Sequence, residues 1–150
     1  MTLALELPHP KVYAADIPLE ALRVASENAS RLGAEIRFVC MDVVDAISGR
    51  FDFVVSNPPY IRRDQMTSLQ REVREHEPHI ALFSRDDELA IYRRLIRGGE
   101  EMLAPGGHIV LEIGIGMDER VLALFGPKWK KLPTKTDLQG IPRTVVAKLQ

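Results

Sequence analysis

The chain has 150 residues and a mass of 16.9 kDa, which is the size of one compact domain. Hydrophobic residues make up 45% and charged residues 27% of it, a composition that excludes a disordered, collagen-like or coiled-coil protein. The net charge of -1 lacks the positive excess that is typical of proteins binding nucleic acid non-specifically.

Cysteine content and hydropathy favour a cytoplasmic protein. The single cysteine, Cys40, excludes an internal disulfide and a cysteine-based zinc site, and we expect it to be a small buried side chain on a strand. All apolar stretches are far shorter than the roughly 20 residues that a transmembrane helix needs. Residues 1–7 lack the basic region of a signal peptide.

The first half of the chain alternates predicted helices and strands. Residues 3–7 are expected to end a helix, because two prolines follow at once, and 11–15 form a short strand that leads to Asp16. A helix then begins near Pro18 and ends at Gly33, with apolar residues at helical spacing: Leu22, Ala25, Ala29 and Leu32. Residues 35–40 and 51–56 are predicted strands.

The second half begins with an arginine-rich segment. Residues 61–85 are predicted to be a loop with a short helix around 66–73. A helix is expected over 86–103, with inward positions Leu89, Tyr92, Leu95, Ile96 and Met102. A turn at 104–107, a buried strand at 108–113, a helix at 118–125 and final strands at 129–136 and 144–149 complete the predicted elements.

This alternation predicts an α/β fold with a mostly parallel, Rossmann-like sheet and an antiparallel hairpin at one edge. The chain is expected to be a single domain, 1–150. In open sheets of this kind, ligands bind beyond the carboxyl ends of the strands. The candidate site residues are therefore Asp16, Asp42, the segment 57–60 and the segment 112–116.

The tetrapeptide Asn57-Pro58-Pro59-Tyr60 directly follows a predicted strand. The side-chain oxygen of Asn57 and the carbonyl of Pro58 can accept the two hydrogens of a planar NH2 group, and Tyr60 offers that group a flat face. Neither proline has an N–H to compete for these acceptors. Such a site orients a weakly nucleophilic nitrogen, which suits methyl transfer; a bare proline turn is the alternative interpretation.

The motif resembles that of S-adenosylmethionine-dependent amino-methyltransferases. More narrowly, the chain resembles the release-factor glutamine N5-methyltransferases, the HemK or PrmC family, through segments that occur in family order: Ala15-Asp16, Ala21-Leu22, Asn28, Asn57-Pro58-Pro59-Tyr60-Ile61, Glu72-Val73, Glu77-Pro78, Ala81-Leu82, Leu103, Pro105-Gly106-Gly107, Leu111-Glu112-Ile113-Gly114, Asp137-Leu138 and Gly140-Ile141-Pro142-Arg143. The tetrapeptide alone does not separate glutamine from adenine or cytosine methylation, whereas the Glu-Pro and Gly-Ile-Pro-Arg segments favour the glutamine enzymes.

The resemblance implies roles for the candidate residues. Asp16 would accept hydrogen bonds from the cofactor ribose, Asp42 would contact the adenine amino group and Val43 would lie against the ring. Each aspartate alone is typical of a helix cap or a surface charge. Asn57 and Pro58 would orient the substrate amide in a pocket that Pro59 and Tyr60 line. The implied cofactor is S-adenosyl-L-methionine and the implied partner is a peptide chain release factor.

The sequence departs from the family pattern at its start. Family members carry a first strand and a Gly-x-Gly-x-Gly loop, which we expect to be absent before Asp16, as is the separate N-terminal helical domain. The exposed sheet edges would then favour a homodimer. The only Gly-x-Gly, at 114–116, has Glu119 at the third glycine position of a dinucleotide fingerprint, so a nicotinamide site is not expected.

The remaining polar residues do not predict a second site. His76 and His79 have no third ligand nearby, so no metal site is expected, and Arg62, Arg63, Arg71 and Arg74 are interpreted as a solvated face or as contacts to an acidic partner. Direct nucleic-acid binding and membrane contact are not expected. Two alternatives stay open: an N6-adenine type nucleic-acid methyltransferase, and a non-catalytic remnant that acts by association.

Overall fold

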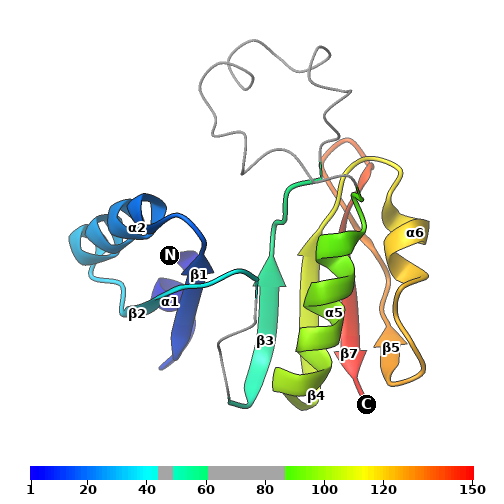
Figure 1. The fold of residues 1–150 in the computed structure, drawn as a ribbon, viewed down its shortest axis with the longest axis horizontal. Coiled ribbons are helices and arrows are strands. Elements are labelled where there is room, and N and C mark those ends of the chain that lie inside the picture. Colours follow the sequence, from blue (N-terminus) through cyan, green and yellow to red (C-terminus); the bar gives the residue numbers. More distant parts are fainter. Residues whose placement is uncertain (44–48, 61–86) are drawn as a thin grey trace. The chain divides into compact units, whose positions relative to one another are not determined.

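The computed structural model describes residues 1–43, 49–60 and 87–150, and Figure 1 shows their helices and strands. The chain divides into two compact units, Met1–Ile47 and Ser48–Gln150. Among the described residues, no helix is both long enough and apolar enough to cross a membrane. The predicted loop at 61–85 and its short helix lie outside the described residues.

The first unit is a βαβ arrangement preceded by a short helix. Its elements are α1 (Thr2–Glu6), β1 (Val12–Asp16), α2 (Leu19–Leu32) and β2 (Ile36–Cys40). Strands β1 and β2 pair in parallel, with Val12 opposite Ile36 and Asp16 opposite Cys40. The expected boundaries are therefore confirmed to within a residue or two.

Helix α2 ends where the sequence predicts. Gly33 has a left-handed φ of 68°, and its N–H donates to carbonyl groups of the last turn, a conformation that costs glycine less than any other residue. Leu22 and Ala29 are buried, as expected, but Leu32 is exposed. The apolar residues at helical spacing therefore form a buried face at Leu22 and Ala29 but not at Leu32.

Cys40 differs from its expected environment. The residue is exposed, and its Sγ donates to the carbonyl of Ile17 at 3.3 Å. Strand β2 has only β1 as a partner in this unit, so a side chain on the strand can remain in contact with solvent. The expectation of a buried thiol is therefore wrong.

The second unit contains a five-stranded mixed sheet. Its elements are β3 (Phe51–Ser56), α5 (Ala90–Met102), β4 (Leu103–Glu112), α6 (Asp118–Leu122), β5 (Trp129–Lys131), β6 (Lys135–Thr136) and β7 (Pro142–Leu149). The strand order is β3-β4-β7-β5, and β6 also pairs with β7. Strands β3 and β4 are parallel, whereas all partners of β7 are antiparallel to it, as expected for a hairpin at the C-terminal end.

The predicted turn at 104–107 is instead part of β4. Phe51 pairs with Leu103 and Phe53 with His108, so the extra residues of β4 form an irregularity within a continuous strand. Gly107 is needed there, because a Cβ atom at this residue would lie 2.9 Å from the carbonyl oxygen of Ala104. The chain therefore changes register without leaving the sheet.

Other boundaries also shift. Helix α5 begins at Ala90 rather than at 86, α6 ends at Leu122 rather than at 125, and the single strand expected over 129–136 is two short strands. In α5, the expected inward residues Tyr92, Leu95, Ile96 and Met102 are buried, while Leu89 is the N-terminal capping residue. The buried face of the sheet includes Ile109, Leu111, Val145 and Ala147, which lie in register across β4 and β7.

Candidate active site

The tetrapeptide 57–60 follows β3 at the carboxyl edge of the second unit's sheet. Asn57 is exposed, Pro58 is buried, and Pro59 and Tyr60 are half-buried. Since β3 and β4 are parallel, with Ser56 opposite Leu111, the residues after both strands lie at the same edge. The structure thus places an exposed amide at Asn57 and a buried proline next to it at the carboxyl edge of this sheet.

Gly114, just after β4, makes room for Tyr60. A Cβ atom at Gly114 would lie 3.0 Å from Cδ2 of Tyr60 and 2.9 Å from Sδ of Met117. A Cβ atom at this position would therefore be tight against both side chains, so the tyrosine ring packs closely against the loop at a residue 54 positions away in the sequence.

Tyr92 supports the same edge from inside the protein. Its ring is fully buried, and its hydroxyl donates to the carbonyl oxygen of Glu112 at 3.0 Å. Burial raises the pKa of Tyr92 strongly, and Tyr60, Glu112 and Glu88 nearby add to the increase. The hydroxyl therefore stays protonated and keeps α5 attached to the end of β4. The sequence identified Tyr92 only as a core residue.

A turn before β7 is tied to this edge through Asp137. The Asp137 carboxylate accepts hydrogen bonds from the backbone N–H groups of Gln139 (2.9 Å) and Ile141 (3.0 Å) and from Nε of Arg143 (3.0 Å). Arg143 in turn accepts a hydrogen bond at its carbonyl oxygen from the N–H of Ile113, at 3.0 Å. The hydrogen bond from Arg143 lowers the pKa of Asp137 most, and the hydrogen bond from the N–H of Ile141 lowers it further.

The two candidate cofactor residues lie in the first unit. Asp16 ends β1, and Asp42 follows the parallel strand β2, so both are at the carboxyl edge of this two-stranded sheet. Both are exposed. Oδ1 of Asp16 accepts from the N–H of Ile17 at 2.8 Å, which fixes the carboxylate at the strand end.

Val43 has an unusual backbone. Its φ is 63°, in the left-handed region that a β-branched residue rarely adopts, and the residue is half-buried. Such a conformation costs about 1–3 kcal/mol and often marks a functional site. The structure thus places Asp16, Asp42 and Val43 on one edge of the first unit, and Asn57, Pro58, Pro59 and Tyr60 on one edge of the second.

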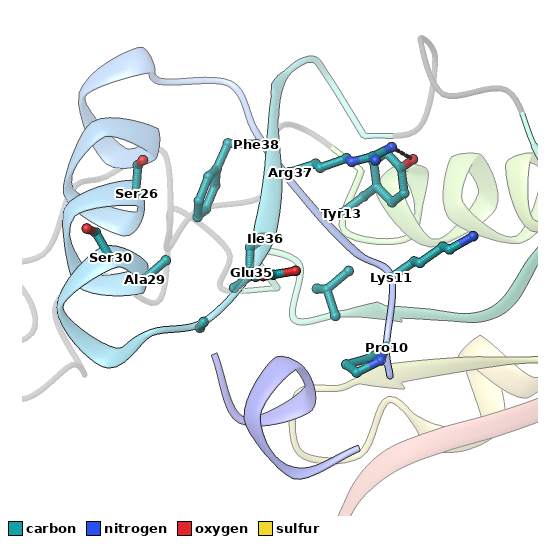
Figure 2. A pocket seen from close by; sticks show the side chains of 12 residues that line it. Pro10, Lys11, Tyr13, Ser26, Ala29, Ser30, Glu35, Ile36, Arg37 and Phe38 are labelled. Atoms are coloured by element: carbon teal, nitrogen blue, oxygen red, sulfur yellow. Dashed lines mark hydrogen bonds between the residues drawn. The ribbon is translucent and has the colours of Figure 1, made fainter. Parts of the chain in front are cut away.

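A pocket of about 430 Å³ lies at the other end of the first unit (Figure 2). It is lined by Ser26, Ala29 and Ser30 of α2 and by residues 10–13 and 34–38 at the starts of β1 and β2. Figure 2 shows Arg37 beside Tyr13, whose hydroxyl oxygen accepts a hydrogen bond from the guanidinium at 2.6 Å. Neither Asp16 nor Asp42 lines the pocket, which is therefore separate from the candidate cofactor residues.

The described ranges hold no cluster of three or more His, Cys, Asp or Glu side chains that would bind a metal ion. The histidines and arginines of the segment after Tyr60, namely His76, His79, Arg62, Arg63, Arg71 and Arg74, lie outside the described residues.

The fold is that of known methyltransferases. The chain superimposes on TrmN from Thermus thermophilus with a TM-score of 0.70 at 19% identity, over 99% of this chain and 39% of that one. A methyltransferase from Pyrococcus furiosus gives a TM-score of 0.68 at 17% identity, over 97% and 66% of the two chains. The expected fold class, a Rossmann-like class I methyltransferase sheet, is thereby confirmed.

Sequence comparison identifies the family. The chain belongs to the methyltransferase small domain family, whose model matches residues 1–76. It is 42% identical over 149 residues to a release factor glutamine methyltransferase of Koribacter versatilis, and 42% identical over 148 residues to one of Streptococcus pneumoniae. These matches include 98% and 97% of this chain but 53% of each relative. The chain thus spans about half the length of these curated relatives.

Proposed function

We propose that the chain is the catalytic domain, 1–150, of an S-adenosylmethionine-dependent methyltransferase that methylates the side-chain amide of a glutamine in a peptide chain release factor. The observation that carries the proposal is the tetrapeptide 57–60 at the carboxyl end of β3, with the ring of Tyr60 against Gly114. Relatives named release factor glutamine methyltransferase that are 36–42% identical over nearly the whole chain support this substrate.

The tetrapeptide orients the acceptor. The side-chain oxygen of Asn57 and the carbonyl oxygen of Pro58 accept the two N–H groups of the glutamine amide, while Tyr60 lies against its plane. An amide nitrogen is a weak nucleophile, so the site contributes mainly orientation and electrostatic stabilisation. When bound, the cofactor would supply a methyl group activated by its sulfonium. The N–C bond would form as the C–S bond breaks and leaves a neutral thioether, and the nitrogen would release one proton to water.

The carboxyl edge of the first unit holds the cofactor in this proposal. Asp16 accepts hydrogen bonds from the ribose hydroxyls, Asp42 accepts one from the adenine amino group, and Val43 packs on the adenine. Oδ2 of Asp16 makes no hydrogen bond to any residue that the structure describes, and the side chain is exposed, so a carboxylate oxygen is available to a diol. These hydrogen-bond acceptors therefore fit the hydroxyl and amino groups of the cofactor.

The proposed location is the cytoplasm, which agrees with the single cysteine.

An exposed sheet edge supports self-association. Strand β3 is the terminal strand in the order β3-β4-β7-β5 and has no second partner among the described strands. An unpaired strand is a template for another chain. We therefore include a homodimer through this edge in the proposal, and light scattering of the purified protein tests it.

The function is tested by a transfer assay. The complete product of the gene that encodes the chain is incubated with radiolabelled S-adenosylmethionine in three separate reactions. One contains a release factor, one contains the same factor with Gln→Ala at its Gly-Gly-Gln motif, and one contains RNA. Label on the unaltered release factor alone supports the proposal. Label on RNA alone supports the N6-adenine alternative, and no label together with no cofactor binding supports a non-catalytic protein.

A further inference from the structure

Two aliphatic side chains project from the loops around the candidate acceptor site. Ile115 is 68% exposed and Leu138 is 107% exposed, the highest values for large hydrophobic residues in the described part of the chain. Ile115 is in the loop after β4, next to Gly114, which contacts Tyr60. Leu138 is in the turn that leads into β7, and Figure 1 shows this turn at the end of the sheet where β3 and β4 finish.

Both side chains are held at the second position of a closed turn. The N–H of Met117 donates to the carbonyl of Gly114 at 3.2 Å, and the N–H of Gly140 donates to the carbonyl of Asp137 at 3.0 Å. Gly116 and Gly140 adopt left-handed φ values of 72° and 80°. These turns restrain the backbone at Ile115 and Leu138, so binding of a partner to the two residues would cost little backbone conformational entropy.

The turn that carries Leu138 has a second restraint. The Asp137 carboxylate holds it through two backbone N–H groups and the side chain of Arg143, whose own carbonyl is bonded to Ile113 beside the other loop. The two loops are thus tied to each other. A single exposed aliphatic side chain is ordinary, but two on linked turns beside one site indicate a contact surface.

Charge distinguishes the kind of partner. In the described part of the chain, the loops at this edge, residues 57–60, 113–117 and 137–141, contain no lysine or arginine, and their one charged residue is Asp137. Helix α6 adds Asp118 and Glu119 in its first turn. Nucleic-acid binding depends on basic side chains that neutralise phosphates, which these loops lack. An uncharged or basic polypeptide suits them better.

We propose that Ile115 and Leu138 form a docking surface for the polypeptide segment that flanks the acceptor glutamine of the protein substrate. The inference rests on the proposed function and extends it by naming the residues that select protein over nucleic acid. Each side chain acts on substrate binding and not on the transfer step.

The test measures binding and transfer separately. Ile115→Ser, Leu138→Ser and the double variant of the complete gene product are titrated with a release factor. The dissociation constant is expected to increase about tenfold for each single variant and more for the double variant, since each loses a buried aliphatic contact. KM for the release factor is expected to increase in parallel, with kcat and the dissociation constant for S-adenosylmethionine within about twofold of wild type.

Leu32→Ser is the matched control, because Leu32 is an exposed leucine of the first unit, 56% accessible. Equal release-factor affinity in the wild type and the double variant would overturn the docking surface, as would loss of release-factor binding when single-stranded RNA competes for it. Weakened binding in the double variant with no methyl transfer by the wild type would instead reject the proposed reaction while supporting the surface.

Discussion

The two units of the chain differ in how much core they contain. Among the described residues of the first unit, the buried apolar ones are Leu22, Ala29, Ala34 and Met41, around a two-stranded sheet. In the second, a five-stranded sheet and α5 bury Tyr92, Leu103, Ile109, Leu111, Ile113, Val121 and Val145 completely. Sheets of two strands are marginally stable in water, whereas larger sheets with a covered face persist alone.

The difference separates two expected roles. The second unit has the rigid part of the proposed site, in which Tyr60, Gly114 and Tyr92 are fixed by packing and by a buried hydrogen bond. The first unit has the exposed carboxylates Asp16 and Asp42 at the end of a small sheet. We therefore expect orientation of the acceptor to depend on the second unit, and cofactor affinity to depend on the first.

The largest expected effect is on stability. Leu111→Ala removes a fully buried side chain from β4 and should destabilise the second unit by about 4 kcal/mol. The single tryptophan, Trp129, is buried in this unit, so its fluorescence during urea unfolding reports the change. Leu22→Ala in the first unit should leave that transition nearly unchanged. An equal shift of the urea unfolding midpoint in both variants would mean that the two units unfold together.

The second prediction concerns the transfer step. Asn57→Ala removes one of the two proposed acceptors for the substrate amide and should lower kcat at least about a hundredfold. The affinity for S-adenosylmethionine, measured by calorimetry, should stay within about twofold of wild type. Asn28→Ala, at an exposed position of α2, is the control and should change neither quantity. Equal losses of cofactor affinity in Asn57→Ala and Asp16→Ala would contradict the division of roles.

The third prediction concerns the cofactor. Asp16→Ala removes a carboxylate acceptor at the end of β1 and should weaken S-adenosylmethionine binding about tenfold, because hydrogen bonds to charged groups are among the stronger ones. The exposed Asp52 on β3 provides a matched Asp→Ala control with unchanged affinity. An Asp16→Ala variant that binds the cofactor as tightly as wild type would contradict the proposed role of Asp16.

The smallest prediction is a pH dependence in the second unit. The pKa of Asp137 is lowered by Arg143, so its stabilising contribution is present above the unfolded value of about 3.9 and is lost as pH falls through the folded value. Asp137→Asn should therefore lower the urea midpoint at pH 7 and approach wild type near pH 3. The exposed Asp52→Asn variant is the control. A difference that stays constant from pH 7 to pH 3 would show that the carboxylate charge is not the cause.

Local patterns in the sequence were sufficient for much of the fold. Helical spacing and Gly33 located α2, and the β-branched and aromatic run located β3 at its observed bounds. Local sequence patterns were wrong where strand pairing with residues far away in the sequence determines the structure. The Pro-Gly-Gly segment within 104–107 has the composition of a turn, yet the residues on either side of it, Leu103 and His108, both pair with β3, so the segment stays within the strand as an irregularity.

The candidate site divides in the same way. The tetrapeptide 57–60 and the two aspartates were identifiable because their chemistry belongs to consecutive residues or to strand ends. The space that Gly114 leaves for Tyr60, the hydrogen bond from Tyr92 to Glu112 and the restraint of Leu138 by Asp137 and Arg143 came only from the tertiary structure. These contacts join residues that lie far apart along the chain or depend on the geometry of a particular turn, and hydrophobic periodicity contains no information about either.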